Sequence, residues 1–235
     1  MTKRYAGDKN WLAVFPVAAV ALLLTAQGLT PSGLDQPIRS LAGARSELVM
    51  AAGRSGRLYL CTALIILGLG CLAVSFVAIG TLCVNTRGST LSNVAAVIAG
   101  LACLSGVVVN SLVNLNVAGA SQAHAGQDVA AQILFTTNTT SVPTGFLIVY
   151  IAGLVVASSL MGTALWVAGS VPRWLGGILP IGLIVASVSP TGPFGVLLAV
   201  PFAVAMIMLS SRIWSGGRPT QAPGLLVGSA TLISP

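Results

Sequence analysis

Long apolar runs separated by short polar segments dominate the chain. Only three charged side chains, Arg87, Asp128 and Arg173, lie between Leu58 and Ser211. A transmembrane helix needs about 20 apolar residues to cross about 30 Å of hydrocarbon. The pattern therefore predicts an all-α, integral membrane bundle of six transmembrane helices, which we place at residues 11–27, 58–83, 93–117, 145–168, 175–189 and 194–211.

Two of these spans raise a question of their own. The first follows a basic start with Lys3, Arg4 and Lys9, as in a signal peptide, but its apolar run is long and no small-x-small cleavage site follows Leu24. We expect a retained helix. The fifth has only about 15 residues, or about 22 Å of helix, so a full crossing stays open. Kinks are expected at the prolines within spans, Pro16, Pro180 and Pro201.

Three segments fall outside the spans. The stretch 38–50 follows Pro37 and has apolar positions at a roughly helical spacing, Ile38, Leu41, Ala42, Ala44, Leu48 and Val49. It is interpreted as an amphipathic external segment that lies on the membrane surface or caps the bundle. Residues 118–143 are interpreted as a polar loop. We assign 1–212 to a single membrane domain and 213–235, rich in Gly, Pro and Ser, to a disordered tail.

Composition supports this class. The chain is 55% hydrophobic and only 6% charged, with a mean hydropathy of +0.96, whereas soluble domains carry about 25% charged residues. Strands of a membrane barrel would alternate apolar and polar positions. The unbroken apolar runs of this chain show no such alternation. The cysteines Cys61, Cys71, Cys83 and Cys103 form no CxxC pair and are expected to pack between helices. We predict no metal and no cofactor.

The distribution of charge predicts an orientation. The net charge is +7, but the basic residues gather at helix ends, which indicates membrane topology rather than a nucleic-acid partner. Six spans place both termini on one side, with seven basic residues: Lys3, Arg4, Lys9, Arg87, Arg173, Arg212 and Arg218. The other side holds four: Arg39, Arg45, Arg54 and Arg57. The prediction is a multi-pass protein of a bacterial plasma membrane with both termini cytoplasmic.

The order of parts resembles a family of six-span bacterial membrane proteins, common in actinobacteria, that is known only as a domain of unknown function. The likeness covers residues 11–212 and rests on the entry to the second span, 53–60, on the long loop after the third span, and on 164–176, which contains Val171-Pro172-Arg173-Trp174. The resemblance implies six helices. It implies no activity and no site residue.

The Val-Pro-Arg-Trp connection also has a physical interpretation. Pro172 suits the first turn of a helix, Arg173 suits lipid phosphates, and Trp174 suits the headgroup level. The same reasoning predicts a set of membrane-interface anchors: Trp11, Arg87, Arg173, Trp174, Arg212 and Trp214.

The third span carries the first candidate site. Asn110 and Asn114 are four residues apart and share a helix face, with Asn116 nearby. Amides are unfavourable in lipid, so this face is expected to point into the bundle. It predicts either hydrogen bonds between helices or a ligand site that opens outward.

A second candidate lies in the following loop. His124 and Asp128 are also four apart. If 121–132 is helical, the two share a face and form a base with its orienting acid or two metal ligands. A third ligand would have to come from Glu47 or Asp35. The competing interpretation is a solvated pair in a loop.

Three functions stay open. Because no span holds an acidic or basic residue, we favour a non-enzymatic accessory, sensing, immunity-type or lipid-interacting bundle. Its partners would be membrane lipids, with a membrane protein or a second copy left open. The alternative is a small transporter or channel for a neutral or apolar solute, although no inverted repeat is visible. A membrane enzyme that uses His124 and Asp128 is the third.

Small residues four apart, Gly153 with Ala157 and Ser158 with Gly162, predict close helix packing.

Overall fold

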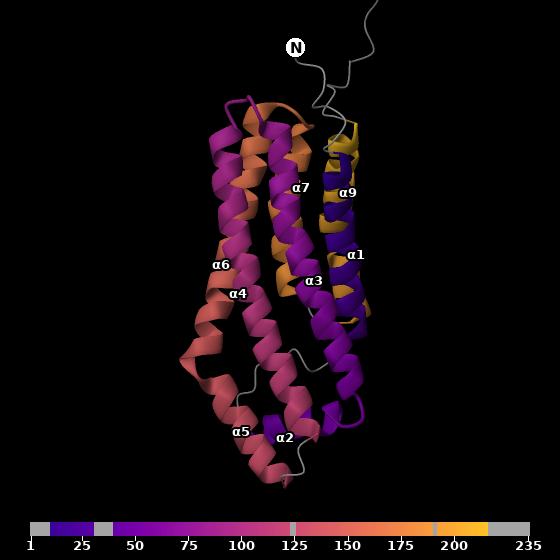
Figure 1. Ribbon diagram of the computed structural model, residues 1–235, viewed down its shortest axis with the longest axis vertical. Coiled ribbons are helices and arrows are strands. Elements are labelled where there is room, and N and C mark those ends of the chain that lie inside the picture. The colour runs from indigo at the N-terminus through magenta and orange to yellow at the C-terminus, as the bar shows by residue number, and fades with distance from the viewer. Residues whose placement is uncertain (1–9, 31–39, 123–125, 190–191, 216–235) are drawn as a thin grey trace, which may run out of the picture.

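The computed structural model describes residues 10–30, 40–122, 126–189 and 192–215, and these residues form helices and connecting turns only (Figure 1). The helices, in chain order, are η1 (Asn10–Ala13), α1 (Val14–Leu29), α2 (Leu41–Ala51), α3 (Ser55–Gly80), η2 (Thr81–Cys83), α4 (Ser89–Gln122), α5 (Gln127–Thr139), α6 (Ser141–Ala168), α7 (Arg173–Val188), α8 (Pro193–Leu198) and α9 (Val200–Trp214). The predicted all-α class is confirmed for the described residues.

Four helices are long and apolar enough to cross a membrane: Trp11–Leu29, Ser55–Cys83, Ser89–Gln122 and Val142–Ala168. They correspond to the first four predicted spans. The last two predicted spans form shorter apolar helices, Arg173–Ser187 and Val200–Trp214, so six crossings stay a prediction. Large apolar side chains such as Leu67, Val97 and Ile181 are about 60% exposed (59%, 65% and 63%), which suits helices surrounded by lipid.

The helices form a ring in the order α1, α3, α4, α6, α7, α9, in which each contacts the next and α9 returns to α1. Figure 1 shows α4 running most of the height of the molecule and α3 reaching below the end of α1, while α1, α7 and α9 occupy only its upper part. A large buried apolar cluster fills the ring and includes Phe76, Met161, Leu179 and Met206.

Glycines set how closely these helices approach one another. A Cβ atom added to Gly162 of α6 would meet the carbonyl oxygen of Gly176 in α7, and one on Gly153 would lie 2.8 Å from the Cβ of Ala102 in α4. Ala157 and Ser158, between those glycines, are fully buried. The predicted small-residue packing along the fourth span is therefore confirmed.

α4 is much longer than a membrane needs. Its 34 residues extend about 51 Å, so its C-terminal part projects beyond the level where α1 ends. There it contacts α2 and α5, which also contact each other. We call α2 and α5 the cap; both lie at the lower end in Figure 1. A small apolar cluster of its own, which includes Ala44, Leu48 and Leu134, holds the cap to the bundle.

The structure corrects three predictions. Segment 118–143 is mostly helical, because α4 continues to Gln122 and α5 begins at Gln127. The sixth span is divided at Ala199, since Pro201 lies in the first turn of a new helix, α9, and does not kink a continuous one. Pro172 precedes α7 as its N-cap and is not part of its first turn.

The predicted amphipathic segment is a helix, α2, with a different buried face. Ser40 caps it by accepting a hydrogen bond from the Gly43 amide at 3.1 Å. The buried residues are Ala44, Glu47, Leu48 and Ala51, whereas Leu41 and Val49 are exposed and Ile38 lies outside the described residues. The contacts of α2 with α4 and α5 thus determine which face of the helix is buried. A location of α2 on the membrane surface stays a prediction.

Candidate functional site: a cavity between the ring and the cap

A cavity of about 770 Å³ lies where the short helices of the ring end and the long ones continue toward the cap. This volume falls within the range of about 300–1,000 Å³ that is typical of small-molecule sites. Every helix of the ring and both helices of the cap contribute side chains to its wall. The cavity is thus a feature of the whole fold and not of one motif.

The deep part of the cavity is apolar. It ends against the large buried cluster, with walls built from Val20, Leu69, Leu72, Leu154, Leu183 and Phe202. Most of these side chains are buried: Leu69, Leu72 and Leu154 are each 1% exposed. The apolar ring core thus provides the floor on which an alkyl chain or ring system could rest.

The part nearer the cap is polar. Its side chains come from the ends of α1 and α7 and from α2, α4, α5 and α6: Gln27, Thr30, Glu47, Asn110, Asn114, Asn138, Thr144, Ser187 and Ser189. We call these nine residues the rim. Along α1 the wall changes from Val20 and Leu23 to Gln27 and Thr30, and along α7 from Leu183 to Ser187 and Ser189. The cavity is therefore amphiphilic along its depth.

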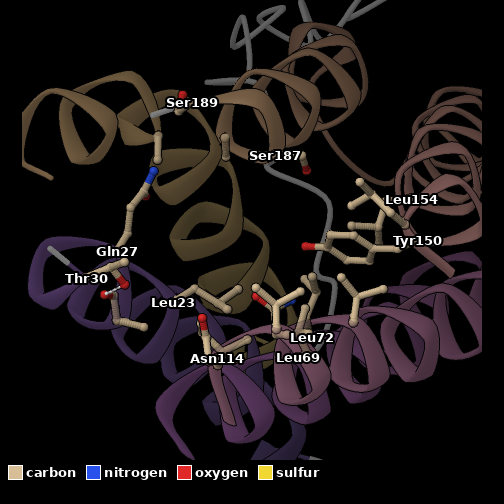
Figure 2. A pocket seen from close by; sticks show the side chains of 18 of the residues that line it. Leu23, Gln27, Thr30, Leu69, Leu72, Asn114, Tyr150, Leu154, Ser187 and Ser189 are labelled. Carbon is tan, nitrogen blue, oxygen red and sulfur yellow. Dashed lines mark hydrogen bonds between the residues drawn. The ribbon is translucent and has the colours of Figure 1, made fainter. Parts of the chain in front are cut away.

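Tyr150 lies at the boundary between floor and rim. Figure 2 shows its hydroxyl group pointing into the cavity, with Leu69, Leu72 and Leu154 around the ring. Its ring packs on α4 at Gly106, where an added Cβ would lie 2.6 Å from Tyr150 Cδ2. Gly106 thus leaves room for one edge of the tyrosine ring, Cδ2 and Cε2, beside α4, and within the described residues the hydroxyl has no hydrogen-bond partner.

Two of the three predicted asparagines belong to this site. Asn110 and Asn114 line the cavity, and Figure 2 shows Asn114 directed into it; Asn116 is not part of the lining. Asn110 Nδ2 donates to the Gly106 carbonyl oxygen of its own helix at 2.8 Å. The spacing of Asn110 and Asn114 predicts hydrogen bonds to a neighbouring helix. No such bond occurs among the described residues, because this polar face of α4 borders a cavity instead.

The continuous helix over 121–132 that the His124–Asp128 prediction requires is interrupted. His124 lies outside the described residues, and the chain leaves helical geometry at Gly126, the N-cap of α5 (ψ 143°). Asp128 instead pairs with Arg45 of α2 at 2.9 Å. Across the parts of the chain that the structure describes, no group of three His, Cys, Asp or Glu side chains is placed to hold a metal ion.

Glu47 lines the cavity, a position that the sequence does not predict. The sequence suggests it only as a possible third ligand for a site at His124, yet its side chain is 6% exposed. The only available signal was its i, i+3, i+4 and i+7 relation to Ala44, Leu48 and Ala51, the buried face of α2. A charged residue on such a stripe is read as exposed unless something polar faces it.

The predicted anchors gather at the opposite end of the molecule. The start of α1, the α3–α4 turn, the α6–α7 connection and the end of α9 all lie uppermost in Figure 1. These segments carry all four tryptophans, Trp11, Trp166, Trp174 and Trp214, which are 48–62% exposed. They also carry Arg87, Arg173 and Arg212. We call this the tryptophan end; its role as an anchor stays a prediction.

Comparison with protein-family models, with curated proteins and with solved structures found no match for this chain. The interpretation of the site therefore depends on its own geometry.

Proposed function

We propose that this protein is a non-enzymatic, lipid-interacting membrane bundle whose cavity binds one amphiphilic molecule with its apolar part on the floor and its polar part at the rim. The observation that carries the proposal is the change from apolar to polar lining along a cavity of about 770 Å³. A ligand that is apolar throughout would leave the Asn114 amide without a partner, and a wholly polar ligand would bury its groups against leucines.

The cavity also lies at a suitable depth for such a ligand. Trp11–Leu29 comprises 19 residues, or about 28 Å of helix, which matches the thickness of the hydrocarbon layer. With the tryptophan end at one interface, as aromatic belts and the positive-inside rule favour, the rim lies at the other interface. A lipid-like molecule would then enter with its headgroup already at the correct level.

Six crossings and cytoplasmic termini belong to the same proposal. α7, α8 and α9 are short, but α8 and α9 together cover Pro193–Trp214, which is long enough to cross with one break. Two of the four arginines on the far side have structural partners: Arg45 pairs with Asp128, and Arg57 Nε donates to the Leu29 carbonyl oxygen at 2.6 Å. Those partners support their external position despite the positive-inside rule.

A transporter for a neutral solute is less well supported. The cavity ends at Leu69, Leu72 and Leu154, and beyond them the ring is filled by residues such as Phe76 and Met161. A path across the membrane would require these buried side chains to separate. Cysteine accessibility at Asn110 and Asn114 from both sides of the membrane would reveal such a path.

The test compares two tryptophan substitutions on α4. Val113 lines the cavity between the two asparagines, whereas Val108 lies on the same helix, is 36% exposed and is outside the lining. The wild-type protein, Val113→Trp and Val108→Trp are extracted with their surrounding lipid, and the lipid-like molecules that co-purify are quantified by mass spectrometry.

The wild-type protein and Val108→Trp should retain one amphiphile at about one copy per chain, and Val113→Trp should lose it. The same co-purifying set in all three proteins would contradict the proposal, because an indole at position 113 would take space between Asn110 and Asn114, where the polar part of the ligand would lie.

A further inference from the structure

Most polar side chains of the cavity lining already have a partner within the protein. Three hydroxyl groups donate to a carbonyl oxygen four residues earlier at 2.6–2.8 Å, those of Thr30, Ser187 and Ser189. Asn110 and Asn138 each donate one amide N–H in the same way. The remaining two rim residues with a partner, Gln27 and Glu47, also interact with other groups of the protein. None of these seven residues needs a ligand in order to be paired.

Three polar side chains of the lining have no hydrogen bond within the part of the chain that the structure describes: Asn114, Thr144 and Tyr150. Figure 2 shows Asn114 of α4 and the Tyr150 hydroxyl of α6 directed into the cavity. A hydroxyl or amide group in a largely apolar wall costs free energy when its hydrogen bonds are not made. These three groups therefore mark where a bound molecule must supply polar atoms.

All three of these groups are uncharged, and each is both a donor and an acceptor. An ammonium headgroup offers donors only, so it would leave the Tyr150 O–H and the Asn114 N–H groups without an acceptor. A carboxylate headgroup offers acceptors only, and no lysine, arginine or histidine occurs among the described lining residues to balance its charge. A headgroup with hydroxyl groups both donates and accepts, and it brings no charge into the cavity.

The spacing of two of these groups favours a headgroup with several oxygen atoms. The Tyr150 ring lies beside Gly106 of α4, and Asn114 is eight residues further along that helix, or about 12 Å toward the cap. A single hydroxyl group cannot reach across this span, whereas a glycerol group joined to an acyl chain presents oxygen atoms along it.

We infer that the cavity selects an amphiphile with an uncharged, hydroxylated headgroup of the acylglycerol type, and that Tyr150 and Asn114 determine this specificity. The inference rests on the proposed function, since it specifies the headgroup of the molecule held in the cavity.

The experiment compares four compounds with twelve-carbon chains: monododecanoylglycerol, methyl dodecanoate, dodecanoic acid and dodecylamine. Each is titrated into the purified full-length protein in uncharged detergent micelles at a pH of about 8, where the acid is ionised and the amine protonated. Binding is read from the rise in unfolding temperature with ligand concentration. The glyceride should bind about tenfold more tightly than the methyl ester, which has the same ester but no hydroxyl group, and than either ion.

Two substitutions with matched controls test the residues that determine the specificity. Tyr150→Phe keeps the ring beside Gly106 and removes only the hydroxyl group; it should weaken glyceride binding about fivefold and leave methyl ester binding within about twofold. Tyr59→Phe is its control, because Tyr59 of α3 is 40% exposed and lies outside the lining. Asn114→Leu should act like Tyr150→Phe, and its control is Asn116→Leu on the same helix, also outside the lining.

Equal falls in a variant and its control would overturn the inference, as would a variant that weakens the glyceride and the methyl ester to the same extent. Unchanged glyceride binding in both Tyr150→Phe and Asn114→Leu would also overturn it.

Failure of this inference is distinguishable from failure of the proposed function. Saturable binding that is lost in Val113→Trp, but with either ion or the methyl ester bound as tightly as the glyceride, overturns the headgroup assignment alone. Absence of saturable binding for all four compounds, or binding that Val113→Trp leaves unchanged, overturns both.

Discussion

The two halves of the ring differ in how their helices meet, although the same long helices build both. Toward the tryptophan end, α6 and α7 touch through Gly162 and Gly176, and the α3–α4 turn touches α6 where Gly88 meets the Ala164 carbonyl oxygen. Toward the cap, the facing positions carry side chains such as Asn110, Asn114 and Leu147, which surround a cavity. Residue size at the helix crossings therefore determines whether this bundle is closed or hollow.

The largest expected effect comes from Gly162→Ala. Its new methyl group would meet the backbone of α7 at Gly176, and a backbone atom cannot rotate away. We expect a loss of about 3 kcal/mol in the free energy of unfolding, measured by equilibrium unfolding in mixed micelles. Gly177→Ala is the control, because nothing lies within 4 Å of an added Cβ there. An equal loss in both would show that tight packing does not explain the closed half.

Gly106→Ala tests the same difference from the other side, because it adds a methyl group beside the cavity instead of in the closed half. The Cβ would lie 2.6 Å from Tyr150 Cδ2 and 3.1 Å from Leu69 Cδ1, but the tyrosine ring has a cavity into which it can turn. We expect a smaller cost, about 1 kcal/mol, together with weaker binding of the amphiphile. The same unfolding measurement applies, the co-purified amphiphile is quantified by mass spectrometry, and Gly100→Ala, with open space around its Cβ, is the control. A cost as large as that of Gly162→Ala would contradict the difference between the halves.

Arg57→Ala tests how the short helix α1 is held at the level of the cavity. Removal of the guanidinium leaves the Leu29 carbonyl oxygen without its 2.6 Å donor. Because Arg57 is exposed, water replaces part of the bond, and the expected loss is about 1 kcal/mol in the free energy of unfolding. Hydrogen exchange at the last turn of α1 should also rise. Arg54→Ala removes a nearby exposed arginine whose side chain does not cap α3 and should leave that exchange unchanged.

The smallest effect is expected in the cap. Arg45 and Asp128 join α2 to α5 at 2.9 Å, with 52% and 79% of their side chains exposed. A double-mutant cycle with Arg45→Ala and Asp128→Ala should give a coupling energy below about 1 kcal/mol that falls with added salt. A larger, salt-insensitive coupling would mean that the pair, rather than the apolar cluster of Ala44, Leu48 and Leu134, holds the cap together.

The sequence predicts the parts of this fold that long apolar runs determine. The spans at 58–83, 93–117 and 145–168 lie within α3 and η2, α4 and α6, respectively, because each buries or exposes apolar side chains on all sides. The sequence predicts a loop where α5 forms, because the Thr-rich end of α5 has low hydropathy. Thr136, Thr137 and Thr139 in fact donate to carbonyl oxygens one turn earlier, and contact with α2 and α4 stabilises the helix.

The site was predictable only in part. The i, i+4 spacing of Asn110 and Asn114 correctly indicated one inward face of α4. The rest of the cavity wall depends on where α1 and α7 end relative to the longer helices beside them. The spacing of residues within one segment cannot predict the relative position of the ends of two helices. Tyr150 was concealed by its apolar surroundings in sequence, and Glu47 by its charge, although both line the same cavity.

The location of all four tryptophans has a spectroscopic consequence. Indole emission from this protein originates at the tryptophan end, whereas the rim lies near the far end of α1, about 28 Å away along that helix. Filling the cavity should therefore leave the native emission spectrum unchanged, even at saturation. A tryptophan substituted for Leu147, a half-exposed wall residue, would add a fluorophore that a bound brominated amphiphile could quench, against a constant background from the four native tryptophans.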